Sequence, residues 1–495
     1  MGCRFLIKNS LVLRGTFLSK FSLFPILLVL VALSSCDKGS ANSNLAPNTH
    51  MAYEAINLSG DLRLNSKVTL SWYGTDKDGY VSGYEISFDG NTWFKTATQD
   101  STFIFGLQAG QDTADIDFFV RSIDEKNVVD PTPAYLKIPL KNTPPQASFT
   151  ADRCSKDTAF VASTFFWSSS DPDGDETIKQ AFIKINTGDW VEVNKNQSLV
   201  SFLVDSAVAN GNAQSEIYYA TNTDPEANMV NGMLVDGLNQ VFLKVIDIAG
   251  AESMVDSSNV FYLKNKNPLS TTLWISGHVA SVAQQYKGFL DAAQVSYDFL
   301  NYGADQGARQ PVYWNPTVSL VLNRYDNVFI NAPNTQFPNV ATGGTATLLN
   351  YLAPLIQDFS KAGKPSFIST ALAKNEDFEG IAGPFPIEGV TQSKGQVRIY
   401  PDSSIYAIDN TLPNLKANSI ISGVTTLLPS NDAELYYRGS ITPLQGWAGD
   451  NVLATARRKD GKLTQVFFGI ELHNYSSNPN SVENLIAHIF DNEFK

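Results

Sequence analysis

The side chains that could carry out chemistry are few in this chain of 495 residues, which contains four histidines and three cysteines. Two of the histidines, His278 and His473, follow short apolar segments in the C-terminal half, and Glu471 lies two residues before His473. Two histidines with an acid could bind a metal or serve a hydrolase. The same residues are also consistent with two hydrogen-bonded histidines at strand ends, so both interpretations stay open.

Aspartates at alternate positions form a second candidate site. Asp171, Asp173 and Asp175 could open a calcium loop, but an EF-hand loop needs a glutamate at its twelfth position, which here is Phe182. Asp-Pro-Asp-Gly is also a good type I turn by its own chemistry. The loop is therefore a weak calcium candidate with an incomplete ligand set, and we expect no metal or other cofactor.

A basic region, an apolar run and a cysteine follow one another at the N-terminus. Residues 1–20 carry four basic residues and no acid, and residues 21–33 are apolar except for Ser22 and Pro25. The run is short for a membrane-spanning helix, and Leu33-Ser34-Ser35-Cys36 follows it. This order is typical of a secretory signal peptide, with an uncleaved anchor helix as the alternative.

The Leu-Ser-Ser-Cys ending resembles the lipobox of bacterial lipoproteins, of the outer-membrane type found in Bacteroidetes. The resemblance implies that residues 1–35 are removed and that Cys36 becomes the first mature residue, diacylated and acylated on its new N-terminus. Three acyl chains such as palmitate exceed the two signals needed for stable membrane attachment. The implied location is the outer membrane, on its periplasmic or its external side. Residues 36–52 are predicted to be a flexible tether.

Composition excludes several classes of protein. The content of 43% apolar residues excludes a disordered chain, and the formal charge of −13 excludes a general nucleic-acid binder. The mature charge becomes −17, because residues 1–35 hold four basic and no acidic residues. Once Cys36 is lipidated, Cys154 has no partner for a disulfide and is either a small buried hydrophobe or a free thiol.

Two segments share an ordered set of markers. Both contain W-x-x-x-D-x-D-G, starting at Trp72 and at Trp167, followed by a glycine with a tryptophan two or three residues later (Gly90 and Trp93, Gly188 and Trp190) and then by a strand that ends in Asp124 or Asp247. Each copy closes on Leu-Lys-Asn with a proline nearby, and the stretches between markers alternate between apolar and polar residues. Alternation over short runs predicts β-strands, and their regular spacing predicts two-sheet sandwiches.

The two copies resemble fibronectin type III and immunoglobulin-like modules, which are common in bacterial surface lipoproteins. We assign them to residues 53–143 and 144–267. The second copy has an additional polar segment around 194–231, which is either a long loop or an added hairpin.

The pattern changes after Pro268. Short apolar runs at 273–276, 325–330, 365–369 and 465–472 predict strands, and helical spacing predicts helices at 347–362 and 481–494, the second with Ser481 as N-cap. Strands alternating with helices favour a mainly parallel sheet covered on both faces, with ligands at the carboxyl ends of its strands. We therefore predict a multidomain protein with two β-sandwich modules and an α/β, flavodoxin-like domain at 268–495.

Residues 268–495 resemble the class I glutamine amidotransferase-like fold in the order of their segments. In that family Gly-Lys-Pro, here Gly363-Lys364-Pro365, leads into the strand that presents the nucleophile. The resemblance places Thr370 at the position of the catalytic cysteine and His473 at that of the histidine. Tyr475 stands where the orienting glutamate is expected, and Leu372 replaces a glycine of the turn. Without the cysteine and the acid, glutamine amidotransfer is excluded.

Other motifs are less informative. Gly343-Gly344 is either a turn or a weak anion cradle before a helix, and no GxGxxG or GxxxxGK[ST] accompanies it. The aromatic residues, 30 Phe, 19 Tyr and 7 Trp, suit either sugar stacking or sandwich cores. Our leading hypothesis is a lipid-anchored envelope protein, non-catalytic, that binds a glycan or a partner protein. The alternative is an envelope or polysaccharide hydrolase that uses His278 and His473.

Overall fold

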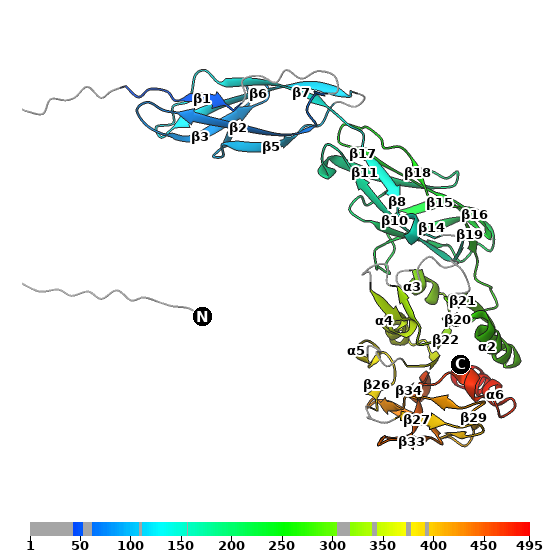
Figure 1. The fold of residues 1–495 in the computed structure, drawn as a ribbon. Coiled ribbons are helices and arrows are strands. Elements are labelled where there is room, and N and C mark those ends of the chain that lie inside the picture. The colour runs from blue at the N-terminus through cyan, green and yellow to red at the C-terminus, as the bar shows by residue number, and fades with distance from the viewer. Residues whose placement is uncertain are drawn as a thin grey trace, which may run out of the picture. The chain divides into compact units, whose positions relative to one another are not determined.

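A computed structural model describes residues 43–52, 62–107, 111–155, 157–303, 317–338, 344–372, 378–391 and 396–495 (Figure 1). The lipobox with Cys36, the predicted signal peptide and Gly343 lie outside these residues. The described chain divides into two compact units, one drawn from 1–57, 69–102 and 115–138 and the other from 58–68, 103–114 and 139–495. Each unit is treated by itself below.

The first module is built from two sheets. One has the order β1 (Asn48–Met51), β2 (Lys67–Thr75), β5 (Asp100–Ile104), and the other β4 (Phe94–Thr96), β3 (Val81–Ser87), β6 (Thr113–Asp124), β7 (Ala134–Lys141). In these sheets β1 pairs with β2, and β3 pairs with β4 and β6, in antiparallel fashion. Strand β2 buries alternate residues, and the ring of Trp72 lies 5.7 Å from that of Phe118 on β6. The tryptophan of the repeated motif is therefore a core residue. Strand β1 lies within the segment 36–52 that the sequence assigned to a tether.

The second module has the same plan with a larger sheet. Its eight-stranded sheet runs β15-β14-β13-β10-β9-β19-β16 with β8 beside β10, and its other sheet runs β12-β11-β17-β18. The bounds are β8 (Gln146–Phe149), β9 (Thr158–Phe160), β10 (Ala162–Ser170), β11 (Ile178–Ile185), β12 (Val191–Val193), β13 (Leu199–Val204), β14 (Gly211–Tyr219), β15 (Met229–Val235), β16 (Gly237–Asn239), β17 (Val241–Asp247), β18 (Asp256–Ser257) and β19 (Phe261–Lys264). The additional polar segment is thus a hairpin, β14–β15, that extends the sheet.

The C-terminal domain contains a nine-stranded sheet. Its order is β21 (Tyr297–Asn301), β20 (Thr272–Ser276), β22 (Asn327–Ala332), β25 (Ser366–Thr370), β35 (Lys462–Phe468), β34 (Val452–Lys459), β32 (Ala433–Gly439), β28 (Ser404–Ala407) and β29 (Leu415–Lys416). The first five strands are parallel, and the pairings from β35 to β29 are antiparallel.

The sheet is therefore mixed, and the prediction of a mainly parallel, flavodoxin-like sheet is corrected. The change of direction occurs at Asp460 and Gly461, which both have positive φ and form the two-residue turn between β34 and β35. Such a turn joins antiparallel strands, whereas parallel strands need a long crossover.

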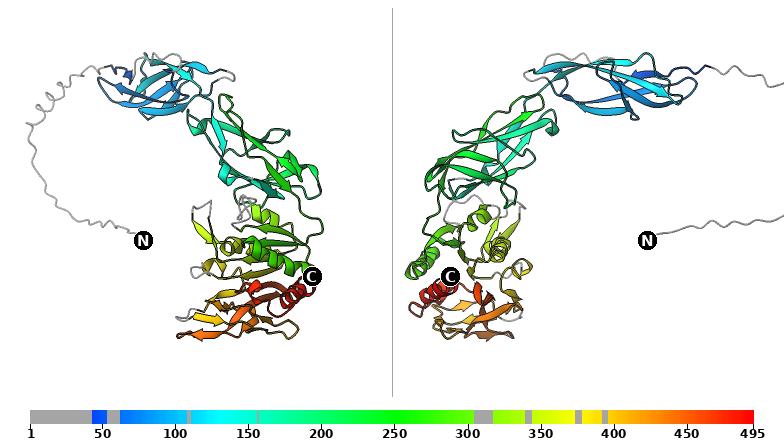
Figure 2. Two further views of the ribbon diagram at one scale, coloured as in Figure 1. Left: turned by 45° about the vertical axis from the view of Figure 1, so that its right-hand side comes forward. Right: turned by 180° about the vertical axis from the view of Figure 1, so that it is seen from behind.

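Helices cover both faces of the parallel strands. Trp274, Phe329 and Phe367 share one buried cluster with residues of α2 (Ala280–Ala292) and α6 (Ser481–His488), which lie side by side (Figure 2). Ile275, Ile330 and the apolar face of α4 (Leu348–Lys361) belong to the opposite cluster. Burial on both faces explains why these strands are continuously apolar.

Several predicted bounds shift by a few residues. Helix α4 begins after its N-cap Thr347, as predicted, but Asn480 rather than Ser481 caps α6, which continues as a π-helical turn at Ile489–Glu493. The last predicted strand stops at Phe468, and a 3-10 turn, η5 (Leu472–Tyr475), follows.

Smaller elements complete the unit. They are the helices α3 (Thr317–Leu322) and α5 (Phe378–Ile381), the 3-10 turns η2 (Ala151–Arg153) and η3 (Asp175–Thr177), and the strands β23 (Gln336–Pro338), β24 (Thr345–Thr347), β26 (Ile387–Val390), β27 (Gln396–Ile399), β30 (Ile421–Ser422), β31 (Leu427–Pro429) and β33 (Thr442–Leu444). Within the described ranges, no helix combines the length and the apolar character needed to cross a membrane.

Candidate functional site

The two histidines singled out in the sequence lie together at the carboxyl end of the parallel strands. His278 follows β20 by two residues and His473 lies in η5, just beyond β35, and their ring centroids are 5.6 Å apart. Parallel strands bring their carboxyl ends to one edge, which explains why residues almost two hundred positions apart meet there. We call His278, Glu471, His473 and Tyr286 the histidine cluster.

Glu471 lies beside His278 without forming an ion pair at neutral pH. Its Oε1 is 3.4 Å from Nε2 of His278, yet that nitrogen is buried and has no hydrogen-bond partner in the described structure. Burial, together with the neighbouring His473, lowers the pKa of His278 to about 4, so the ring is neutral at pH 7. Burial likewise raises the pKa of Glu471.

Tyr286 of α2, which no sequence motif marks, connects the cluster to the sheet. Its hydroxyl lies 3.0 Å from Oγ of Ser369 on β25 and 3.4 Å from Nδ1 of His473. Ser369 in turn donates to the carbonyl of Ile470 at 3.1 Å and accepts from the N–H of Leu472 at 3.0 Å. These two buried hydroxyls therefore position the segment that carries His473.

The fold places Tyr286 between the sheet and the histidines. Ala283, Tyr286 and Leu290 occupy the buried face of α2 at helical spacing, and neither this helix nor the tyrosine was predicted from the sequence. Full burial raises the pKa of Tyr286 well above its usual value, which keeps the hydroxyl protonated. Tyr286 can thus donate or accept a hydrogen bond in the cluster, but it is not an activated nucleophile.

Thr370 is separated chemically from the histidine cluster. It ends β25, is only 1% exposed, and donates its Oγ1 hydrogen to the carbonyl of Ala332 on β22 at 2.9 Å. Leu372 and Tyr475, the other two positions named in the sequence, are buried side chains of the core. No hydrogen bond joins Thr370 to a histidine in the described part of the chain.

Two aspartates of the second candidate site accept backbone N–H groups of their own loop, although Oδ2 of Asp171 and Oδ1 of Asp173 are buried without a hydrogen-bond partner in the described structure. Asp171 accepts the N–H of Asp173 at 2.8 Å, and Asp175 accepts the N–H of Asp171 at 3.0 Å. Asp171 and Asp173 are buried, whereas Asp175 is exposed. Among the residues that the structure describes, no group of three or more His, Cys, Asp or Glu side chains could hold a metal ion.

Cys154 is a buried thiol. Its Sγ lies 3.3 Å from the carbonyl oxygen of Thr150 and 3.4 Å from that of Phe166, and burial raises its pKa to about 11. Because the thiolate is the reactive form, this side chain is unreactive near neutral pH.

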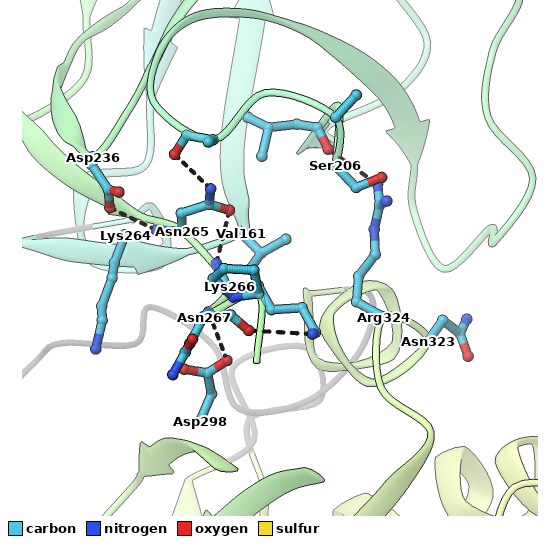
Figure 3. A pocket seen from close by; sticks show the side chains of 14 residues that line it. Val161, Ser206, Asp236, Lys264, Asn265, Lys266, Asn267, Asp298, Asn323 and Arg324 are labelled. Atoms are coloured by element: carbon cyan, nitrogen blue, oxygen red, sulfur yellow. Dashed lines mark hydrogen bonds between the residues drawn. The ribbon is translucent and has the colours of Figure 1, made fainter. Parts of the chain in front are cut away.

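A cavity of about 840 Å³ lies in the second unit, away from the histidine cluster (Figure 3). Lys266 places its ammonium 4.9 Å from the ring of Tyr325, and Asp298 accepts from the Tyr325 hydroxyl at 2.7 Å. Arg324 donates to the carbonyl of Val204 at 3.0 Å. The cavity lining therefore combines apolar surface with polar groups, several of which already form hydrogen bonds within the chain.

Comparisons with known proteins give low similarity. No family model matches the chain, and no curated protein matches it. Fibronectin(III)-like modules of Clostridium thermocellum CbhA are 14% identical over 44% of this chain and 94% of that one, with a TM-score of 0.17. A Thermoplasma acidophilum protein described as a component of a GMP synthase is 9% identical over 45% of this chain and 94% of that one, with a TM-score of 0.28.

The carbohydrate deacetylase Agd3 is 14% identical over 44% of this chain, with a TM-score of 0.27, and the match spans 32% of the deacetylase. TM-scores this low carry no argument. The two β-sandwich modules and the mixed-sheet domain are defined by their strand pairings.

Proposed function

We propose that this protein is a lipid-anchored component of the cell envelope whose C-terminal domain binds a glycan or a partner protein without catalysing a reaction. The observation that supports this proposal is that the hydroxyl of Thr370 is buried and donates a hydrogen bond to a backbone carbonyl of β22. Nucleophilic catalysis needs a hydroxyl or thiol within hydrogen-bond reach of a base that a third group orients. Here the candidate bases contact Tyr286 and Glu471 instead.

The order of the parallel strands supports a more specific proposal for this domain. Strands β20, β22, β25 and β35 are adjacent, and Gly363-Lys364-Pro365 enters β25 after α4, as in the class I amidotransferase-like order. We infer an amidotransferase-like ancestor that lost its reaction, since Thr370, Leu372 and Tyr475 replace the cysteine, the glycine and the acid. The carboxyl edge of the sheet would then serve for binding.

Restoring the cysteine should not restore the reaction. Thr370→Cys is expected to release no ammonia from glutamine above the wild-type background, because Tyr475 cannot orient His473 and Leu372 crowds the turn. A displacement of about an ångström can cost on the order of a hundredfold in rate. The assay is ammonia release by the purified mature protein, and Thr317→Cys provides a buried control. Turnover by Thr370→Cys alone would show that the elbow geometry survives.

A hydrolase is the second candidate function, and one observation favours it. Nε2 of His278 is buried, has no hydrogen-bond partner among the described residues and lies 3.4 Å from Oε1 of Glu471. A neutral imidazole beside a carboxyl group could act as a general base on a bound water. In this case the substrate would be an envelope or other polysaccharide.

Complementation by histidine variants separates the two functions. In a strain that lacks the gene, His278→Gln with His473→Gln should support growth and polysaccharide binding as the wild type does, because glutamine keeps a hydrogen-bonding group at each position of the binding edge but cannot accept a proton. Binding is measured by retardation in native gels containing polysaccharide, and folding by circular dichroism. His50→Gln is the control substitution outside this domain. A folded double variant that still binds the polysaccharide but fails to complement would favour the hydrolase.

A further inference from the structure

In each module, the aspartate that ends a strand accepts two kinds of hydrogen bond, one on each carboxylate oxygen. One oxygen binds the turn that follows the strand, and the other binds the segment that enters the module. In the second module Asp247 is fully buried, and its Oδ1 accepts the N–H of Ala251 at 2.8 Å, which closes the turn after β17. Its Oδ2 accepts the side-chain amide of Asn142 at 2.6 Å. Asn142 belongs to the segment through which the chain enters this module.

The first module repeats this arrangement with different residues. Asp124 is fully buried at the end of β6, and its Oδ1 accepts the N–H of Val128 at 2.8 Å, again four residues ahead. Its Oδ2 accepts the side-chain amide of Asn44, which lies in the segment that enters this module. The same division of oxygens therefore occurs in both units.

The acidic loops of the W-x-x-x-D-x-D-G motif hold the next residue of each entering segment. Asp173 accepts the N–H of Thr143 at 2.7 Å, and Asp78 accepts the N–H of Leu45 at 3.1 Å. In both segments the asparagine is followed three positions later by a proline, Pro47 in one and Pro145 in the other. Proline fixes φ and favours an extended residue before it, so the segment approaches the module in an extended form.

A third Asn-x-x-Pro segment, Asn265-Lys266-Asn267-Pro268, enters the C-terminal domain. Its contacts are related but not identical, because Asp298 accepts the backbone N–H of Asn267 at 3.0 Å and Asp236 accepts that of Asn265 at 2.9 Å (Figure 3). Each of the three segments thus donates a backbone N–H to an aspartate of the domain that it enters.

We propose that the acidic loop and the strand-ending aspartate of each sandwich form a docking site for the chain's own Asn-x-x-Pro segment. The site recognises one side-chain amide and one backbone N–H with two carboxylates, and its ligand is a polar peptide segment. This assignment explains why the repeat retains both acidic markers together with the asparagine and the proline. In the second module it accounts for Oδ2 of Asp173 and Oδ2 of Asp247, whereas Oδ1 of Asp173 and Oδ2 of Asp171 are buried without a hydrogen-bond partner in the described structure.

Burial makes the two sites unequal. Asn142, Asp173 and Asp247 are 6%, 2% and 0% exposed, whereas Asp78 lies on the surface of the first module. A hydrogen bond to a carboxylate gains strength when water is excluded from it. We therefore expect the second module to depend on its docked segment more strongly than the first.

Exchanging the two partner groups tests the proposal in the full mature chain. Asn142→Asp places two carboxylates together, and we expect the amide of Thr143 to exchange with solvent at least about tenfold faster. Adding Asp247→Asn should restore protection, because the new amide group keeps an oxygen for Ala251 and donates to the new carboxylate at position 142. Asn212→Asp, at an exposed position of β14, is the control. Asn44→Asp should produce a smaller increase near Leu45.

Two outcomes would overturn the proposal. The first concerns the rate of hydrogen exchange at the Thr143 amide. The proposal is wrong if this rate is unchanged in Asn142→Asp, or if it stays fast in the folded double variant. The other is protection of the Thr143 amide that appears only with millimolar calcium and is lost in Asp171→Asn. The second result would assign the carboxylates to a cation instead of the segment.

Discussion

Replacing Cys36 with alanine should release the protein from the membrane or leave it unprocessed. Lipid on this cysteine is the only proposed anchor, since the apolar run at 21–33 is shorter than the roughly 20 residues that a spanning helix needs. Residues 37–48 are polar and cannot insert by themselves. We expect complete loss of palmitate label and recovery of the released protein in the soluble fraction after a carbonate wash.

Cys3→Ala is the matched control for this experiment, because Cys3 lies in the segment proposed to be removed. It should keep both the label and the membrane fraction. A Cys36→Ala protein that stays in washed membranes and is cleaved at the wild-type site would contradict the lipoprotein assignment. Labelling of Cys3→Ala and of the wild type must be compared at equal expression.

Acid should destabilise the C-terminal domain between pH 6.5 and pH 4. Burial lowers the pKa of both His278 and His473 to about 4, whereas a histidine in the unfolded chain has its ordinary pKa of about 6.5. Within this window the unfolded state binds protons that the folded state does not, so the free energy of unfolding falls as the pH is lowered. The contribution of these two histidines is constant above the window and levels off below it.

His278 accounts for most of the expected loss. Its side chain is 7% exposed, and a shift from about 6.5 to about 4 corresponds to about 3 kcal/mol. His473 acts in the same direction but is more exposed, so its share is smaller. Glu471 acts in the opposite direction, because a raised folded pKa favours the folded state as the pH falls.

Hydrogen exchange of the amides in β20 and β25 measures this loss for the domain itself. As the pH is lowered through this window, the free energy of opening should fall less steeply in His278→Gln than in the wild type. The slopes should differ by about 1.4 kcal/mol per pH unit, since one titrating group is gone. His50→Gln should leave the wild-type slope unchanged. An unaltered slope in His278→Gln would show that His278 is protonated in the folded domain.

The parts of the architecture that depend on local pattern could be predicted from the sequence. The markers at Trp72 and Trp167 identified two β-sandwiches, because alternation places apolar side chains on one face of a strand. The helix at 347–362 was predicted from helical spacing and begins at its N-cap Thr347. His278 and His473 were identified because they are rare side chains that follow buried strands, and the structure brings them together.

Other features depend on contacts between residues that are far apart in the chain. The antiparallel half of the large sheet was missed, because β28 and β29 are short and a turn such as Asp460-Gly461 fixes the strand direction only once its strands are paired. Tyr286 and Ser369 have ordinary core patterns, and their polar role arises when α2 packs over β25.

The sequence by itself determined which residues are chemically available. It contains no cysteine after Cys154, and the acidic and Asn-x-x-Pro markers recur along it. Only the tertiary structure decided what those residues contact. A carboxylate, a hydroxyl or an imidazole has the same composition in a binding, catalytic or structural role. Its partners and its burial, which fix its pKa and its free lone pairs, are set by segments that meet only on folding.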